Sequence, residues 1–298
     1  MAASALHGFL VVDKPAGITS HDVVARVRRA ADRRVRVGHA GTLDPIATGV
    51  LVLALGAATR LVEWATGQDK RYRAELTFGV ETDSYDADGR IVAERPVAIS
   101  PAELARALDA FRGEIEQRPP AFSAVQVGGR RLYALARRGA AVEAPRRRVT
   151  IRELALLDWR PPRATIELLC SKGTYVRSLG HDLGQALGCG AHLSALRRLA
   201  SGAFTLADAV ELEAAVEAIA AGRGEQILRR LELAVADLPV VAPGLEGVAA
   251  LRRGQPWTPP ERPIWPIMLA RAHDPEGELV AIVAWRGDAW WPRKVLVR

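Results

Sequence analysis

One aspartate stands in a tightly constrained loop. The stretch GHAGTLDPIATGVL, residues 38–51, places Asp44 directly before Pro45 and within a run that holds three glycines. Glycine admits tight backbone conformations and proline fixes the φ angle that follows, so this carboxylate is held in a defined position. Such a carboxylate serves as a nucleophile, a base, a metal ligand or a helix cap, and an Asp-Pro pair taken alone is typical of a plain turn.

Two other stretches carry side chains that suit this carboxylate. KRYRAE places Tyr72 between two arginines at the start of an expected strand, and CSKGTYVRSL separates Tyr175 from Arg177 by one valine. An extended chain would aim Tyr175 and Arg177 to the same side. Arginine is the cation that keeps a buried carboxylate charged, and an aromatic ring beside that pair suits a planar nucleobase. Each tyrosine taken alone also fits a core residue with a hydrogen-bonded hydroxyl.

The positive charge of the 298-residue chain is concentrated in two segments. The formal net charge is +7, whereas residues 26–36 alone carry +5 and residues 126–152 carry +7, which leaves the rest of the chain at −5. Such segments are typical of solvated faces or of a surface that binds a polyanion, above all a nucleic acid. Charge alone does not separate the two interpretations.

Motifs for several other chemistries are missing from the sequence. Cys170 and Cys189 form no CxxC pair, the histidines show no metal-ligand spacing, and no Walker, GxGxxG or GxSxG pattern occurs. ETDSYDADGRIVAER resembles a calcium loop, but Ser84 and Arg95 stand where its first and twelfth ligands belong. We therefore expect no cofactor and no metal. Two lone cysteines, no apparent signal peptide and no apolar run of membrane length favour a cytoplasmic protein.

Hydrophobic patterning predicts strands and helices that alternate irregularly. Ser100, followed by Pro101 and then Glu103, predicts a capped helix start, and Ser20 is predicted to cap a helix over 21–31. The other expected elements are strands at 8–13, 50–55, 72–80, 148–158 and 163–170 and helices at 58–66, 176–187 and 206–236. Since no regular strand–helix–strand spacing appears, we expect an α/β (α+β) fold with a mixed sheet.

The character of the sequence changes after DLPVVAPG, residues 237–244. Five of the seven tryptophans follow residue 250, together with many prolines and two short apolar runs, LVAIVAW and KVLV, which predict strands. We therefore expect a boundary near 238–246, with a catalytic domain of residues 1–240 and a small β-rich domain of residues 241–298.

Five blocks in order make the sequence similar to the bacterial tRNA pseudouridine synthase B family over about residues 8–210. The blocks are GFLVVDKPAGITSHDVV, VGHAGTLDPIATGVL, DKRYRAELTFGVETDSYDADG, RPPAFSAVQVGGRRLYALARRG and CSKGTYVRSLGHDLG. The resemblance implies a pseudouridine synthase fold, a C-terminal PUA-like RNA-binding domain, and isomerisation of the T-loop uridine at position 55 of tRNA. It also implies a monomer that needs neither a cofactor nor an obligatory protein partner.

The same resemblance implies roles for single residues. Asp44 matches the catalytic aspartate, Arg177 its arginine partner, and Tyr72 the tyrosine that stacks on the uracil. Asp44 would act as a nucleophile at C1′ or C6, or as a base at C2′, and the sequence does not choose among these routes. His39 matches a histidine that contacts the RNA where the base leaves its stack, and Tyr175 would line the pocket.

The basic segment at about 118–152 matches the part of the family that clamps the T stem-loop. The arginines that we expect to bind RNA there are Arg130, Arg131, Arg146, Arg147 and Arg148. Val125 and Gln126 stand where many members carry lysine, so either one phosphate contact is lost or nearby arginines replace it. Asp86 is expected to be a pocket or loop residue rather than a catalytic one.

Three other functions fit parts of these observations. A guide-dependent pseudouridine synthase of the dyskerin type shares the aspartate block, but the basic clamp segment and the lack of a lysine-rich tail favour a stand-alone enzyme. A tRNA-folding chaperone in which catalysis is secondary fits the basic segments equally well. A glycosidase that uses Asp44 lacks an evident carboxylate pair.

Overall fold

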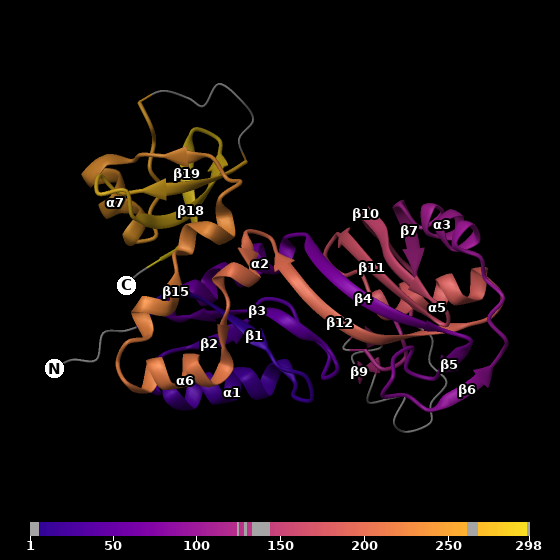
Figure 1. Cartoon of the computed structure of the whole chain (residues 1–298). Helices are drawn as coiled ribbons and strands as arrows, with labels where there is room; N and C mark the ends of the chain where they lie inside the picture. Colours follow the sequence, from indigo (N-terminus) through magenta and orange to yellow (C-terminus); the bar gives the residue numbers. More distant parts are fainter. Residues whose placement is uncertain (1–5, 124, 128–129, 133–143, 261–267, 297–298) are drawn as a thin grey trace.

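A mixed sheet forms the body of the molecule (Figure 1). The structure, a computed structural model, describes residues 6–123, 125–127, 130–132, 144–260 and 268–296, with only the backbone of 126–127 and 130–131. The strands of the main sheet are β1 (Gly8–Lys14), β2 (Val37–His39), β3 (Thr48–Leu55), β4 (Lys70–Phe78), β7 (Gly113–Gln117), β10 (Arg147–Arg160), β11 (Arg163–Cys170), β12 (Ala191–Ser201), β13 (Phe204–Thr205), β14 (Val210–Glu211) and β15 (Leu228–Arg229).

The order of the strands confirms the mixed sheet expected from the sequence. The main path runs β14-β1-β3-β12-β4-β11-β10-β7, with β15, β2 and β13 attached to β1, β3 and β12. The pairs β1–β14 and β3–β12 are parallel, and the other pairs in this sheet are antiparallel. Two small pairs lie apart, β5 (Val80–Thr82) with β6 (Ile91–Glu94) and β8 (Gln126–Val127) with β9 (Arg130–Arg131).

The two halves of the sheet meet at a short parallel junction. β3 and β12 are paired at only two positions, Thr48 with Arg197 and Gly49 with Arg198. β12 then pairs along its length with β4, and Figure 1 shows both strands running from one half of the sheet to the other. Gly49 has a φ of +95°, and a Cβ there would lie 2.2 Å from the carbonyl oxygen of Arg198. Glycine therefore lets the two backbones meet where a larger residue would separate them.

Both faces of the sheet are buried at β1 and β3, which explains the continuous apolar runs in these two strands. Successive residues of a strand point to opposite faces, so Leu10 and Val12 join one hydrophobic cluster while Phe9 and Val11 join another. The first cluster packs against the helices α1 (Ser20–Ala30), α3 (Pro101–Asp109), α5 (Val176–Ala186) and α6 (Leu212–Ala220). The second packs against the short helices η1 (Gly56–Leu61), α2 (Val62–Gly67) and η4 (Leu231–Val235). In the described ranges, no helix is long and apolar enough to cross a membrane.

One of the two predicted helix caps is confirmed and the other is wrong. Ser100 and Glu103 form a capping box at the start of α3, with Pro101 in the first turn. At α1 the cap is Thr19, which forms a capping box with Asp22, so the helix includes the expected cap Ser20. The hydroxyl of Ser20 is instead fully buried against another loop, and a local cap could not serve that distant interaction.

The single helix predicted over 206–236 is also wrong. The segment holds one α-helix, α6, flanked by the short helices η2 (Leu206–Asp208) and η3 (Gly224–Ile227) and by strands β14 and β15. Both strands pair with β1, so backbone pairing within the sheet overrides the helical composition on either side of α6. Gly222, with a φ of +74°, ends the helical conformation after Ala220.

A small β-rich unit follows at the C-terminal end, as expected from the sequence (Figure 1). Its sheet has the order β16 (Val240–Val241), β17 (Leu269–His273), β18 (Leu279–Arg286) and β19 (Ala289–Val295), and α7 (Gly244–Arg252) packs against it around the buried Trp290. Leu279, Ile282 and Leu296 pack into the second cluster of the main body. Arg293 and Lys294 lie 3.3 and 3.4 Å from Glu63 on α2. The division at residues 238–246 stays a prediction.

Gly49→Ala is expected to lower the free energy of unfolding by about 3 kcal/mol, because it adds overpacking to an unfavourable positive φ. The Cβ would meet three backbone atoms of Arg198, and none of them is the end of a flexible side chain. Urea unfolding followed by circular dichroism measures the change.

Gly113→Ala is the matched control. Gly113 has a similar φ of +84°, but a Cβ there would meet nothing within 4 Å. We expect it to cost about 1 kcal/mol, from backbone strain alone. Equal decreases in stability for the two variants would contradict the close approach of β3 and β12 as the reason for Gly49.

Candidate active site

The loop that carries Asp44 joins β2 to β3 and is tied to the N-terminal segment. Ser20 donates its hydroxyl to the carbonyl of Leu43 at 3.0 Å and accepts the amide of Leu43 at 2.8 Å. Lys14, which is fully buried, donates its ammonium group to the carbonyl of Ala47 at 2.7 Å. These hydrogen bonds hold the loop on both sides of the aspartate, so its carboxylate has a fixed place.

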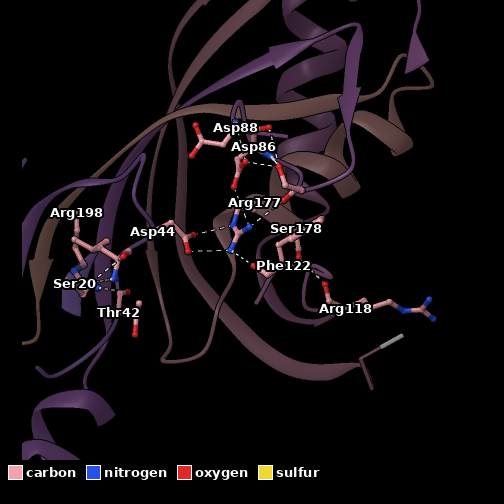
Figure 2. Close-up of polar contacts among 12 residues, drawn as sticks. Ser20, Thr42, Asp44, Asp86, Asp88, Arg118, Phe122, Arg177, Ser178 and Arg198 are labelled. Carbon is pink, nitrogen blue, oxygen red and sulfur yellow. Dashed lines mark hydrogen bonds and ion pairs between the residues drawn. The ribbon is translucent and has the colours of Figure 1, made fainter. Parts of the chain in front are cut away.

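A further tie reaches this loop from β12. Arg198 is only 1% exposed, and its Nε donates to the carbonyl of Val50 at 2.6 Å. Its Nη2 donates to the carbonyl of Gly41 at 3.1 Å. Its Nη1 donates to the carbonyl of Thr42 at 3.4 Å (Figure 2). One guanidinium thus holds the segment both before and after Asp44.

The carboxylate of Asp44 lies against Arg177 in the first turn of α5 (Figure 2). Nη2 of Arg177 donates to Oδ1 of Asp44 at 3.2 Å, and Nε lies 3.0 Å from Oδ2. On the other side, Nη1 of Arg177 lies 3.1 Å from Oδ2 of Asp86. The side chains of Arg177 and Asp86 are 5% and 7% exposed, whereas that of Asp44 is 34% exposed. Asp44 is therefore the more accessible of the two carboxylates.

Backbone carbonyls complete the surroundings of this arginine. Nη1 of Arg177 donates to the carbonyl of Ser84 at 3.2 Å, and Nη2 donates to the carbonyl of Phe122 at 3.1 Å. The hydroxyl of Ser84 donates to Oδ1 of Asp86 at 2.5 Å. Because the guanidinium binds two carboxylates and two carbonyls, its orientation is fixed.

The turn that carries Asp86 is itself held on α5. Tyr85 has a φ of 65°, a conformation that costs a residue with a side chain about 1–3 kcal/mol and persists only where neighbours enforce it. Its ring stacks on His181, one helical turn after Arg177, with ring centroids 3.8 Å apart. The stack fixes the turn at the place where Asp86 meets Arg177.

Opposing effects set the pKa of Asp44. Burial raises this pKa most strongly, the adjacent Arg177 lowers it, Asp86 raises it and Lys14 lowers it, and the net direction is upward. A carboxylate that acts in its ionised form at neutral pH therefore depends on Arg177.

A cavity of about 1190 Å³ lies over this pair, and both expected tyrosines line it. Tyr72 on β4 is 8% exposed, and burial raises the pKa of its hydroxyl while Arg198 opposes that rise. Tyr175 caps α5, and its backbone is held by the buried side chain of Gln117, which accepts its amide at 3.0 Å. The guanidinium carbon of Arg147 lies 4.3 Å from the centroid of the Tyr175 ring, so a cation and an aromatic face flank the same opening.

The other residues predicted to bind RNA lie around this cavity or outside it. His39 is half-buried at the end of β2, and its ring meets that of His21, which lines the cavity, at 5.3 Å. Burial and the neighbouring His21 and Arg198 lower the pKa of His39. The side chains of Arg146 and Arg148 are exposed, and they face Glu116 and Glu114 of the edge strand β7 at 3.9 and 3.4 Å.

Part of the predicted clamp falls outside the described residues. Arg130 and Arg131 form β9, but the structure describes only their backbone. Residues 124, 128–129 and 133–143 of the segment 118–152 also lie outside the ranges that the structure describes. Binding of RNA by this segment stays a prediction.

Sequence reasoning missed several residues that shape the site. Lys14 and Arg198 were not expected at the site, Ser20 was expected only as a helix cap, and Asp86 only as a pocket or loop residue. Lys14 closely follows the apolar run of β1 and Arg198 stands at the start of an apolar pair in β12, and a charge beside such runs is the signal that could have revealed them. Among the described residues, no group of three or more His, Cys, Asp or Glu side chains is placed to hold a metal ion.

Comparison with known proteins gives this arrangement a family. Residues 28–176 match the N-terminal domain of TruB family pseudouridylate synthases, and residues 177–236 match the tRNA pseudouridylate synthase B C-terminal domain. The tRNA pseudouridine synthase B of Symbiobacterium thermophilum is 52% identical over 84% of this chain and 82% of its own length. That of Ralstonia nicotianae is 40% identical over 98% of this chain and 94% of its own length.

A solved structure shares the fold over nearly the whole chain. It is an H/ACA RNP bound to a substrate RNA containing 2′-deoxyuridine, and the chain that matches is 26% identical with a TM-score of 0.75. The match covers 98% of this chain and 86% of the other. The two domain matches and the identity to full-length relatives, over a fold with a buried aspartate–arginine pair beneath a cavity, show that this chain belongs to the tRNA pseudouridine synthase B family of isomerases.

Proposed function

We propose that this enzyme isomerises the T-loop uridine at position 55 of tRNA to pseudouridine, with Asp44 as the catalytic carboxylate. The observation that carries the proposal is the Asp44–Arg177 pair beneath a cavity lined by Tyr72 and Tyr175. The relatives' names support tRNA as the substrate. Such a substrate is reached in the cytoplasm.

The reaction breaks the N1–C1′ bond of uridine and joins C5 to C1′, so C5 loses a proton and N1 gains one. No electrons are exchanged with a second molecule. Asp44 acts as a nucleophile at C1′ or C6, or as a base at C2′, and each route uses its ionised form. Arg177 keeps that form charged, and Tyr72 stacks on the uracil and assists loss of the C5 proton.

The uridine reaches this cavity only after it leaves its stack, because its reacting atoms are otherwise covered. His39 at the rim binds the RNA that remains, and Tyr175 lines the pocket for the flipped base. Arg147 lies inside the opening and meets a phosphate beside the target nucleotide, while Arg130, Arg131, Arg146 and Arg148 neutralise phosphates of the T stem. A catalytic domain of residues 1–240 and an RNA-binding PUA-like domain of residues 241–298 share these tasks in a monomer without an obligatory partner.

Two assays separate the proposal from its alternatives. A guide-dependent enzyme needs partner molecules, and the likeness to a chain of an H/ACA RNP is the observation that favours it. On an unmodified tRNA transcript, the pure chain forms pseudouridine only if it acts without such partners. The arginine-rich segments favour a tRNA-folding chaperone in which catalysis is secondary, and such a chaperone would still fold tRNA after Asp44→Asn has stopped isomerisation.

Asp44→Asn is expected to slow pseudouridine formation by at least about 10³-fold, because it removes the reacting carboxylate but preserves shape. The measurement is a single-turnover assay with carbodiimide mapping of the T loop. Affinity for tRNA and the unfolding midpoint should stay close to those of the wild type. Turnover that survives this change would contradict Asp44 as the catalytic group.

Arg177→Ala is expected to move the acid limb of the pH–rate profile to higher pH. The rate falls as pH drops through the pKa of Asp44, and removal of Arg177 takes away the charge that lowers this pKa. Single-turnover rates between pH 5 and pH 9 (about the useful range for such an assay) give the profile.

Asp86→Asn is expected to shift the pKa of Asp44 in the direction opposite to that of Arg177→Ala. The Asp86 carboxylate raises the pKa of Asp44, so its removal is expected to move the acid limb to lower pH. Identical acid limbs in the wild type and both variants would refute the electrostatic role of this cluster.

Neutralising Arg146, Arg147 and Arg148 together by glutamine is expected to weaken tRNA binding and to flatten its dependence on salt. In a plot of the logarithm of the binding constant against the logarithm of salt concentration, the slope should become shallower by about one unit for each phosphate that is no longer neutralised. Filter binding at several salt concentrations measures the slope. Arg160→Gln is the control, since Arg160 is an exposed arginine at the other end of β10. Equal slopes in the triple variant and the control would show that these three arginines lie outside the RNA interface.

A further inference from the structure

Arg198 has an uncommon set of hydrogen-bond partners for a buried arginine. Its three described hydrogen bonds to the backbone end on Gly41, Thr42 and Val50, which flank Asp44 in the chain. Within the described residues, no carboxylate lies within ion-pair distance of its guanidinium. Burying a cation without an anion is costly, so these carbonyls replace both water and a counter-ion.

Arg198 also lies opposite Tyr72 in the sheet. Arg198 and Tyr72 are direct partners in the register between β12 and β4, so their side chains leave the sheet on the same face. Both side chains line the cavity over Asp44, and Arg198 opposes the rise that burial causes in the pKa of the Tyr72 hydroxyl. Arg198 therefore connects two parts of the site that come from separate strands: the loop that carries Asp44 and the ring of Tyr72.

The other ties of the loop do not make this connection. Lys14 and Ser20 hold it to the N-terminal segment, which carries neither the tyrosine nor α5. Arg177 binds the carboxylate of Asp44 but not the backbone of its loop. Arg198 is hydrogen-bonded to the backbone on both sides of Asp44 and is also the direct cross-strand partner of Tyr72.

We propose that Arg198 is a positioning residue for the isomerisation, which holds the Asp44 loop at a fixed separation from Tyr72. This inference rests on the proposed function, in which the carboxylate acts at the sugar or C6 while the phenol stacks on the uracil. The two groups must address one nucleotide while its base is detached and turned. A displacement of about 1 Å between such groups lowers a rate by about 10²-fold.

The neighbouring residue gives a matched control. Arg197 stands next to Arg198 on β12, is 41% exposed, and pairs with Asp13 at 2.7 Å on the opposite face of the strand. Arg197→Met and Arg198→Met remove the same group from the same strand. Only the second removes the hydrogen bonds to the Asp44 loop and the guanidinium opposite Tyr72.

The test measures single-turnover pseudouridine formation and tRNA affinity for both variants. We expect Arg198→Met to lower the rate constant about 100-fold with an unchanged dissociation constant, because binding does not need the alignment that chemistry needs. Arg197→Met should keep the wild-type rate. Equal rates for Arg198→Met and the wild type, or an equal decrease in both variants, would overturn the proposal.

Arg198→Lys covers the case in which Arg198→Met does not fold. The lysine keeps the charge, but its single ammonium group cannot reach the carbonyls on both sides of Asp44 together. We expect it to fold and still to be slow. Full activity of Arg198→Lys would show that charge alone suffices, which would overturn the positioning role.

Hydrogen exchange of the amides at residues 41–44 separates failure of this inference from failure of the proposed function. Faster exchange in Arg198→Lys than in the wild type is expected whether or not either protein turns over tRNA, because the loop is no longer tied to β12. Unchanged exchange would overturn the inference. A wild type that forms no pseudouridine would instead overturn the proposed function, and the exchange result would still decide whether Arg198 holds the loop.

Discussion

A single guanidinium between two carboxylates is the interaction on which the site depends. Arg177 touches Asp44 and Asp86, and burial of all but the Asp44 face strengthens each ion pair. The same burial makes the arrangement intolerant of change, because a carboxylate without its cation would take up a proton. Most of the nearby structure can be understood as holding these three groups in place: the start of α5, the turn at Tyr85, and the loop after β2.

The position of Asp44 and Arg177 follows from the short parallel junction between β3 and β12. β3 and β12 meet at two residues only, and the Asp44 loop lies directly before that joint. Gly49 allows the backbones of β3 and β12 to approach closely. From β12, the side chain of Arg198 then hydrogen-bonds the Asp44 loop. Packing and the candidate site are therefore linked at one point, because β12 both pairs with β3 and holds the Asp44 loop.

The three consecutive arginines at the start of β10 have two different surroundings. Arg147 lines the cavity and lies over Tyr175. Arg146 and Arg148 are exposed and face glutamates of β7. Exposed pairs of this kind contribute little to stability, so these arginines can exchange a glutamate for a phosphate at small cost. This division is consistent with one arginine near a flipped nucleotide and two along a stem.

The sequence by itself determined the features that depend on neighbours along the chain. The glycines and proline around Asp44, the apolar runs of β1 and β3, and the capping box at Ser100 are local, so the constrained aspartate, the mixed sheet and α3 could be predicted. Family resemblance supplied Arg177 and Tyr72 as partners of Asp44. Tertiary structure decided what depends on residues far apart: Asp86 against Arg177, Arg198 against the Asp44 loop, Ser20 in that loop rather than at a cap, and β14 and β15 in place of one helix. Each of these follows from strand register and burial, which a local pattern does not encode because its partner lies tens to hundreds of residues away.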